Sequence, residues 1–343
     1  CRELALEEIK PIVEQYGEAA RRAREAGCDA MELHAAHSYM LAGSFLSPLR
    51  NKRTDAYGGT IDGRLRFLLE VMASIRAKAG RDFPIILRIS GDEHLPGGRD
   101  IRDTQYIAPK LVKAGVDAFH ISGGVVPDLF WRILPCMGAP PGLNVSAAAA
   151  VKQVVDVPVM VVGKITDPRL AEDILDKGQA DMVVMGRALL ADPELPNKAA
   201  EGRFEDIAPC TSCGLGCLRT QLTYEPMTCV INPTVGSEKE MVITPAAKPK
   251  RVLVVGGGPG GLEAARVAAL RGHQVTLYEK ESKLGGQLNL AAIPPMKQEL
   301  SKWIIYLSVQ VKKVGVRVEL NKEVTPELIE EMKPDVVVVA TGG

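Results

Sequence analysis

The stretch 158-PVMVVGKITDPRLAEDILDKGQADMVVMG-186 contains one complete strand–helix–strand repeat. Residues 158 to 163 and 180 to 186 are short, continuously apolar runs, and residues 168 to 177 between them follow a helical period. Continuously apolar strands are typical of a parallel sheet that is buried on both faces. The stretch therefore predicts a parallel α/β fold.

The same repeat extends towards the beginning of the chain. Three more apolar runs are found at residues 28–34, 84–90 and 117–122. Helical patterns cover residues 3–26, 62–79, 103–114 and 146–155, and a last helix reaches about residue 201. Five units are too few for a closed barrel of eight. Because the chain starts at Cys1 directly in a helical pattern, we expect three units upstream, and we assign residues 1–205 to strands 4–8 of a TIM (β/α)8 barrel.

Polar residues end these strands, where such barrels carry their active sites. The last two strands end in Gly163-Lys164 and Gly186-Arg187, which offer close backbone approach and a cation at the usual phosphate position. Arg88 lies in an otherwise apolar strand and is interpreted as a cation that faces an anionic cofactor, with an internal ion pair as the alternative.

The first visible strand ends in 34-HAAHSY-39. His34 and His37 can both donate a hydrogen bond to a carbonyl oxygen, and Tyr39 can donate a proton. A zinc site and structural histidines under a loop are the alternatives. His120, at the end of another strand, is interpreted as a core or rim histidine.

After residue 250 the pattern changes to 251-RVLVVGGGPGGLEAARVAALRGHQVTLYEK-280, which is strand, glycine turn, helix and strand. Gly256, Gly258 and Gly261 satisfy G-x-G-x-x-G, and Glu279 ends the next strand, where it can bind a ribose hydroxyl. The runs 285-GGQL-288 and 340-ATGG-343 favour FAD over NAD. We assign residues 236–250 to a linker and 251–343 to an incomplete Rossmann-like FAD-binding domain.

Four of the seven cysteines lie at 210–229 with the spacing C-x2-C-x3-C-x11-C. Three of them fall within eight residues, as expected when thiolates surround an iron–sulfur cluster, whereas zinc commonly uses two separated C-x2-C pairs. We therefore interpret residues 206–235 as a [4Fe-4S] segment, with zinc and free thiols as alternatives.

Composition excludes several classes of protein. Lys+Arg and Asp+Glu each number 42, so the net charge is zero, and no basic tract points to nucleic acid. No apolar run approaches a membrane span, and no signal peptide is recognised. Clustered cysteines in odd number are not a secreted disulfide framework, so a cytoplasmic location is expected.

The motifs together resemble the multidomain iron–sulfur branch of the old yellow enzyme family, which includes 2,4-dienoyl-CoA reductase, 2-enoate reductase, the bile-acid-inducible NADH:flavin oxidoreductases and trimethylamine dehydrogenase. They occur in the family's order: 34-HAAHSY-39, 46-LSPLRNKRTDAYGG-59, 161-VVGKITDP-168, 185-MGRALLADPELPNK-198, the cysteine run, 256-GGGPGG-261, 284-LGGQL-288 and 340-ATGG-343.

The resemblance implies three bound cofactors, with NAD(P)H as electron donor. FMN in the barrel would contact Arg88 through its N1/C2 carbonyl edge and Gly163, Lys164, Gly186 and Arg187 through its phosphate. A [4Fe-4S] cluster would be held by Cys210, Cys213, Cys217 and Cys229. FAD would be bound by the glycine motif with Glu279 and Gln287. The first three barrel strands and the NAD(P)-binding part would be missing from this sequence.

The resemblance further implies reduction of the C=C bond of an α,β-unsaturated carbonyl compound: a 2-enoate, enoyl-CoA or enone. Electrons would pass from NAD(P)H to FAD, the cluster, FMN and the substrate, with His34 and His37 holding the carbonyl and Tyr39 donating the proton. The alternatives are an amine dehydrogenase or demethylase of the trimethylamine dehydrogenase type and a non-catalytic electron-transfer or zinc-held scaffold. No nucleic-acid or membrane partner is expected, and a homo-oligomer stays open.

Overall fold

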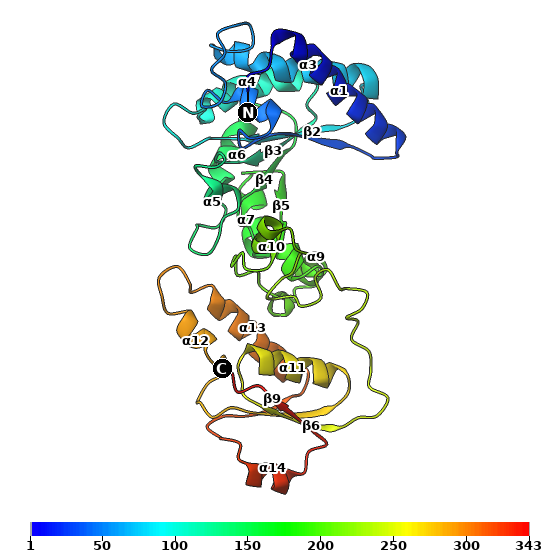
Figure 1. Cartoon of the computed structure of the whole chain (residues 1–343), viewed down its shortest axis with the longest axis vertical. Helices are drawn as coiled ribbons and strands as arrows, with labels where there is room; N and C mark the ends of the chain where they lie inside the picture. Colours follow the sequence, from blue (N-terminus) through cyan, green and yellow to red (C-terminus); the bar gives the residue numbers. More distant parts are fainter. Residues whose placement is uncertain (1, 343) are drawn as a thin grey trace. The chain divides into compact units, whose positions relative to one another are not determined.

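The computed structural model describes residues 2–342 and divides the chain into two compact units. The first unit comprises the residues up to Pro135 together with Ala139–Met185. The second comprises Cys136–Gly138 and the residues from Gly186 onward. Because the two units are not placed relative to each other, each is described by itself (Figure 1).

The first unit alternates helices and strands as the sequence predicts. Its elements are α1 (Leu6–Glu25), β1 (Met31–Ala35), α2 (Leu41–Leu46), α3 (Ile61–Ala79), β2 (Ile85–Ser90), α4 (Ile101–Lys113), β3 (Ala118–Ser122), α5 (Phe130–Ile133), α6 (Val145–Lys152), β4 (Val159–Val162), α7 (Pro168–Asp176) and β5 (Met182–Val184). The short helices α2 and α5 were not expected, because single helical turns carry too little periodicity to be recognised.

All five strands of this unit are parallel, and each pairs with the next one along the chain, in the order β1-β2-β3-β4-β5. The register places His34 beside Arg88 and Arg88 beside His120. Sequential parallel strands joined by helices are the arrangement from which a (β/α) barrel is built. The predicted α/β class is thereby confirmed.

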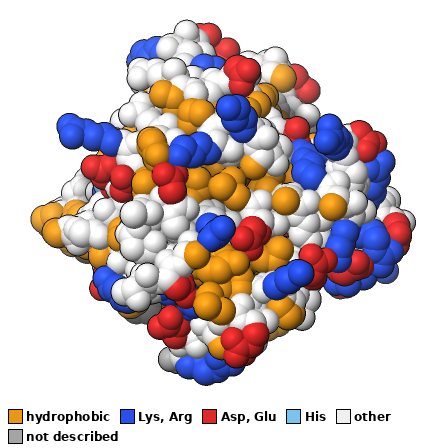
Figure 2. Space-filling model, turned by 90° about the horizontal axis from the view of Figure 1, so that it is seen from above, with side chains coloured by type: hydrophobic (Ala, Val, Ile, Leu, Met, Phe, Trp, Pro, Cys, Tyr) orange, Lys and Arg blue, Asp and Glu red, His pale blue; other side chains and the backbone are white. Residues whose placement is uncertain are grey.

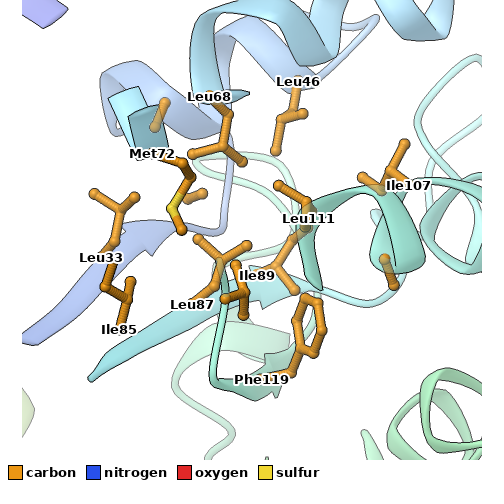
Figure 3. Packing of buried hydrophobic residues seen from close by; sticks show 14 of the residues in the cluster. Leu33, Leu46, Leu68, Met72, Ile85, Leu87, Ile89, Ile107, Leu111 and Phe119 are labelled. Carbon is orange, nitrogen blue, oxygen red and sulfur yellow. The ribbon is translucent and has the colours of Figure 1, made fainter. Parts of the chain in front are cut away.

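One face of this sheet packs against helices α1 to α4 and forms the core of the unit. In Figure 3, Leu33, Leu87 and Phe119 of the strands meet side chains such as Leu68 and Leu111 of the helices. Most of these side chains are completely buried, and each such leucine or phenylalanine contributes about 2 kcal/mol through burial.

The opposite face of the strands differs from the expectation. Because successive side chains of a strand alternate between faces, the residues between the core positions form this second face. They include Glu32, His34, Arg88 and His120 beside apolar residues such as Ile86 and Met160, so this face is partly polar and not apolar throughout. Short strands rich in Val and Ile conceal this alternation, since the four polar residues are spread over three separate strands.

The second unit holds a four-stranded parallel sheet in the order β8-β7-β6-β9. Its elements are α8 (Arg187–Ala191), α9 (Leu195–Ala200), the 3-10 helix η1 (Phe204–Asp206), α10 (Cys217–Thr223), β6 (Arg251–Val255), α11 (Pro259–Leu270), β7 (Gln274–Tyr278), α12 (Leu288–Ala291), α13 (Leu300–Lys313), β8 (Arg317–Glu319), α14 (Pro326–Met332) and β9 (Val336–Val339). Helices α11 and α13 cover this sheet with a common apolar core. Strand β8 and helix α14 were not expected from the sequence.

The cysteine segment belongs to the second unit. Cys210 and Cys229 pack against the core formed by β6, α11 and α13. At the start of the segment, Asp206 accepts hydrogen bonds from Lys313 at 2.8 Å and Gln310 at 3.1 Å, which tie η1 to α13. The Lys313 ammonium is the main cause that lowers the pKa of Asp206 to about 2. The boundaries at 205/206 and 235/236 remain a prediction.

Acidic and basic side chains are interspersed with apolar ones on the face that Figure 2 shows. This mixture agrees with the equal numbers of acidic and basic residues in the sequence. Within residues 2–342, no helix combines the length and the apolar character that crossing a bilayer requires.

Candidate functional site

The chain reverses directly after β1 through an unusual turn. His37 and Ser38 have φ angles of 64° and 58°, a left-handed backbone that residues other than glycine seldom adopt. The turn gathers three rings: His34 lies 5.6 Å from both His37 and Tyr39, and His37 lies 6.3 Å from Tyr39, between ring centroids. The structure thus brings together the three residues that the sequence proposed as catalytic.

His37 is the buried member of the three, with 2% of its surface exposed. Its Nε2 lies 3.2 Å from the Ser122 hydroxyl, whereas its Nδ1 is buried without a hydrogen-bond partner among the described residues. Burial, followed by the positive charge of Arg88, lowers the pKa of His37 to about 4. The imidazole is therefore neutral at pH 7, and its buried Nδ1 makes no hydrogen bond within the described chain.

His34 is half-buried, and its tautomer follows from its contacts. Its Nδ1 accepts a hydrogen bond from the backbone N–H of Ala36 at 3.3 Å. Burial first, and then the charge of Arg88, lowers the pKa of His34, while Glu32 opposes the shift. A neutral ring that accepts at Nδ1 carries its proton at Nε2, so Nε2–H is a donor.

Tyr39 lies at the exposed rim, with 54% of its surface accessible. Its ring is nearly parallel to that of His37, at an interplanar angle of 10°. A phenol at this position is accessible to a small molecule. The arrangement provides two neutral donors and one acidic hydroxyl within one small volume.

Arg88 lies beside His34 in the neighbouring strand. Its Nε is buried without a hydrogen-bond partner, and no carboxylate of the described chain forms an ion pair with it. Glu32 instead pairs with His120 Nδ1 at 2.9 Å, and this hydrogen bond is the main cause that lowers the pKa of Glu32. His120 is thus buried and partnered at Nδ1, whereas its Nε2, like Arg88 Nε, has no hydrogen-bond partner among the described residues.

The two glycine–cation pairs predicted to bind a phosphate fall in different units. Gly163 and Lys164 have φ angles of 153° and 53°, and the Lys164 ammonium donates to the Ala139 carbonyl at 2.6 Å. Gly186 precedes α8 of the second unit, and Arg187 is the first residue of that helix. Their joint role in phosphate binding stays a prediction.

The four clustered cysteines line one small cavity of about 20 Å³. A side chain at Gly216 would place its Cβ 2.4 Å from the carbonyl oxygen of Thr228, so this glycine lets the Cys217 segment approach the Cys229 segment. The hydroxyls of Thr211 and Ser212 are buried there without a hydrogen-bond partner among residues 2–342. The lining also includes Arg187.

Two thiols of this cavity are shifted away from the thiolate form by their surroundings. Burial is the main cause that raises the pKa of Cys210 and Cys217, and the charge of Arg187 opposes the shift. In the described part of the chain, no three His, Cys, Asp or Glu side chains are arranged to hold a metal ion. Four cysteines around one cavity with unsatisfied hydroxyls nevertheless match the donors that an iron–sulfur cluster requires.

In the second unit, three glycine-rich segments meet at the end of β6. Gly256 has a φ of 108°, and a Cβ on it would lie 2.3 Å from the carbonyl oxygen of Ala340. Gly286 approaches Gly258, with 3.0 Å between its Cβ position and the Gly258 Cα. A Cβ on Gly261 would lie 2.0 Å from the Gly256 carbonyl oxygen. Such close backbone approach is what binding of a dinucleotide pyrophosphate requires.

Glu279 directly follows β7 and is buried beside this glycine turn. Its carboxylate accepts the backbone N–H of Gly257 at 2.7 Å and that of Glu281 at 2.9 Å. Gln287 lies near Gly342, with 3.9 Å between its Nε2 and the Cβ position of that glycine. The residues predicted for FAD therefore lie together, and Glu279 also fixes the turn.

Residues around the His37 turn were missed by the sequence analysis. The buried side chains of Ser38, Ser90, Glu93 and Arg99 surround the turn or contact its neighbours. No spacing rule connects them, because the partners are more than 50 residues apart along the chain.

Comparison with known proteins places this geometry in a family. Residues 1–206 match the NADH:flavin oxidoreductase / NADH oxidase family. Residues 251–335 match the FAD dependent oxidoreductases. A solved 2-naphthoyl-CoA reductase in complex with 2-naphthoyl-CoA is 37% identical, with a TM-score of 0.92 over 100% of this chain and 52% of that chain.

Three relatives illustrate the range of the family. A metal reductase of Desulforamulus reducens is 42% identical over 99% of this chain and 51% of its own length. A cinnamate reductase of Clostridium sporogenes is 39% identical over 100% of this chain and 53% of its own length. An N,N-dimethylglycine/sarcosine dehydrogenase of Chromohalobacter salexigens is 38% identical over 100% and 50%. The chain thus spans about half the length of these relatives.

The match to the flavin oxidoreductase family covers more than half of this chain, and the relatives align with nearly all of it. The chain belongs to the NADH:flavin oxidoreductase / NADH oxidase family, in its 2-enoate reductase-like branch of old yellow enzyme relatives.

Proposed function

We propose that the protein to which this chain belongs reduces the C=C bond of an α,β-unsaturated carbonyl compound with electrons from NAD(P)H. The observation that carries the proposal is the grouping of two neutral histidines and one accessible tyrosine around a single turn. The 39% identical cinnamate reductase supports this reading, since its name describes reduction of a conjugated acid.

His34 and His37 would hold the carbonyl oxygen of the substrate. His34 can donate from Nε2, because its Nδ1 is occupied as an acceptor. His37 can donate from Nδ1 when the Ser122 hydroxyl donates to its Nε2. Two donors aimed at one oxygen stabilise the negative charge that develops there during reduction.

Tyr39 would supply the proton. Reduction of a C=C bond adds a hydride at the β-carbon and a proton at the α-carbon. The phenol O–H gives its proton to the α-carbon as the electron pair of the enolate forms the new C–H bond, and the phenolate then recovers a proton from water. Its exposed position permits this recovery.

FMN, when bound in the first unit, would supply the hydride. Arg88 fits such a group, because its buried Nε has no hydrogen-bond partner within residues 2–342 and a cation on that face favours an electron-rich flavin edge. The assignment of Gly163, Lys164, Gly186 and Arg187 to its phosphate is part of the same proposal.

In the second unit, Gly256, Gly258 and Gly261 would cradle the pyrophosphate of FAD, with Glu279 and Gln287 as further contacts. FAD would accept the electrons of NAD(P)H. Cys210, Cys213, Cys217 and Cys229 would hold a [4Fe-4S] cluster, which supplies one-electron transfer between the flavins. We keep residues 206–235 as the segment that binds it and 236–250 as the linker. Loading this site requires the cysteines to lose their protons, against the raised pKa of Cys210 and Cys217.

Oxidation of a methylated amine is the second candidate, because a sarcosine dehydrogenase is 38% identical over the whole chain. The two histidine donors argue against it, since an amine nitrogen offers no oxygen for them to hold. An assay that offers both kinds of substrate to one preparation separates the two candidates.

The experiment uses the full-length protein, purified without oxygen and loaded with its flavins. NADH and NADPH oxidation is measured with 2-cyclohexen-1-one, cinnamate and N,N-dimethylglycine as alternative substrates. We expect turnover with the enone or the enoate and a loss on the order of 100-fold in His37→Ala. Turnover confined to the amine, or His34→Ala and His37→Ala variants as active as the wild type, would refute the proposal.

A further inference from the structure

The His37–Ser38 turn carries backbone strain that its own sequence does not relieve. Two consecutive residues other than glycine adopt a left-handed φ, at 64° and 58°. Each such residue costs about 1 kcal/mol or more and persists only where the surroundings fix it. The turn also sets the mutual positions of the three proposed catalytic rings. The residues that fix the backbone of the turn therefore also control the geometry of these rings.

The backbone of the turn is fixed on both sides of His37. The His37 N–H donates to the Ser90 hydroxyl at 2.9 Å, and the His37 carbonyl accepts the Val126 N–H at 3.0 Å. Ser90 in turn donates to the Gly124 carbonyl at 3.1 Å. Strands β2 and β3 therefore determine where the His37 backbone lies.

Ser38 is fixed by a buried carboxylate. Its hydroxyl donates to Glu93 Oε1 at 2.8 Å. The other oxygen, Oε2, accepts from the Ser47 hydroxyl at 3.0 Å and from the Arg99 N–H at 2.9 Å. Glu93 is 1% exposed, and a Cβ on Gly98 would lie 2.9 Å from Oε2, so the glycine at this position makes room for the carboxylate.

Glu93 and Arg99 lie at the two ends of a short loop, which a backbone hydrogen bond between them closes. The Glu93 N–H donates to the Arg99 carbonyl at 2.9 Å. The buried Arg99 guanidinium donates to Thr104 and to the Ser90 carbonyl, and the negative charge of Glu93 partly offsets the cost of burying this cation. The same strand end, Ser90, thus supports the turn directly through its hydroxyl and supports Arg99 through its carbonyl.

We propose that Glu93 is a positioning residue for the reaction: through Ser38 it holds the left-handed turn that orients His37 and Tyr39 towards the substrate. Ser38 lies between the two proposed catalytic residues, so loss of its anchor releases both at once. The inference rests on the proposed function, because it needs His37 and Tyr39 to act on the substrate.

Ser38→Ala and Ser47→Ala form a matched pair for the test. Each serine is buried and donates to the same carboxylate at nearly the same distance, but only Ser38 belongs to the turn. In the flavin-loaded full-length protein, reoxidation of reduced FMN is followed with 2-cyclohexen-1-one and, separately, with ferricyanide. Ferricyanide takes single electrons and needs no histidine donor or tyrosine proton.

We expect Ser38→Ala to lower the ratio of the enone rate to the ferricyanide rate on the order of 10-fold, since small displacements of reacting groups are costly. In Ser47→Ala the ratio should stay within about twofold, although both variants lose similar thermal stability. Glu93→Gln keeps the shape and can donate its amide to Ser38, so it should retain more of the enone rate than Glu93→Ala.

Equal ratios in Ser38→Ala and Ser47→Ala would overturn the positioning role, even if Glu93→Ala fails to fold. A wild-type protein that reduces ferricyanide but no enone would instead overturn the proposed function. The two failures are therefore distinguishable in one set of measurements.

Discussion

The turn after β1 and the turn after β6 both reverse the chain at the end of a parallel strand, but they reach a left-handed backbone by different means. After β6 the left-handed position is Gly256, whose φ of 108° costs little because no Cβ is present. After β1 the positions are His37 and Ser38, which adopt the same kind of backbone against a steric cost.

A buried carboxylate holds each of these turns. Glu279 accepts the backbone N–H of Gly257 at 2.7 Å, and Glu93 accepts the hydroxyl of Ser38 at 2.8 Å. The glycine turn is formed by residues that are adjacent in the sequence, and the Glu279 carboxylate stabilises it further. The histidine turn depends on partners from other strands, so its side chains can be catalytic while its backbone is held from outside.

The largest effect that tests this comparison is expected in the glycine turn. Gly261→Ala would put a Cβ 2.0 Å from the Gly256 carbonyl oxygen, so the free energy of unfolding of the second unit should fall by at least about 3 kcal/mol, with loss of FAD. Gly260→Ala is the control, because its Cβ meets nothing within 4 Å. Guanidinium unfolding and flavin content measure both; equal behaviour of the two variants would contradict the geometry.

Because His37 is buried, the free energy of unfolding should depend on pH. The pKa of His37 is about 4 in the fold, below the ordinary value of 6.5. The unfolded chain then binds more protons between these values, so stability present above pH 6.5 is lost as the pH falls towards 4, by about 3 kcal/mol.

This contribution is measured as the difference between wild type and His37→Gln in urea unfolding at pH 7, 5 and 4. Carboxylates that are protonated in the same range act in both proteins and cancel. A constant difference across the three pH values would show that burial does not depress the pKa of His37.

A smaller effect is expected when the outside support of the histidine turn is removed. Ser90→Ala leaves the buried N–H of His37 and the carbonyl of Gly124 without their partner, which should cost about 2 kcal/mol. Ser74→Ala is the matched control, because the Ser74 hydroxyl is buried without a hydrogen-bond partner in the described chain, so its removal should be neutral or stabilising. Thermal unfolding compares the two, and an equal loss would mean that Ser90 does not support the turn.

The smallest effect tests whether a loss of stability elsewhere in the first unit also disturbs the histidine turn. Thr60 caps α3 by accepting the N–H of Gly63 at 3.1 Å, so Thr60→Ala should cost about 1 kcal/mol. The ratio of enone to ferricyanide turnover in the Thr60→Ala variant should match that of the wild type. A lower ratio would mean that any loss of stability in the first unit disturbs the catalytic rings.

Much of the fold could be predicted because its signals are local. The apolar runs gave all five strands of the first sheet and their parallel order, and the G-x-G-x-x-G run gave β6, α11 and β7. The polar second face of the first sheet was missed, since it depends on which residues of β1, β2 and β3 lie side by side. Strand β8 was missed because three residues carry no measurable period.

The sequence by itself determined the parallel α/β class, the family and the residues available for chemistry: His34, His37, Tyr39, four clustered cysteines and a glycine turn. These are set by residue type and spacing along the chain. The tertiary structure alone decided that both histidines are neutral, that Arg88 keeps an unused donor while Glu32 pairs with His120, and that Glu93 holds Ser38. The physical reason is that burial and hydrogen bonding join residues from different strands, and their separation along the chain leaves no periodic trace.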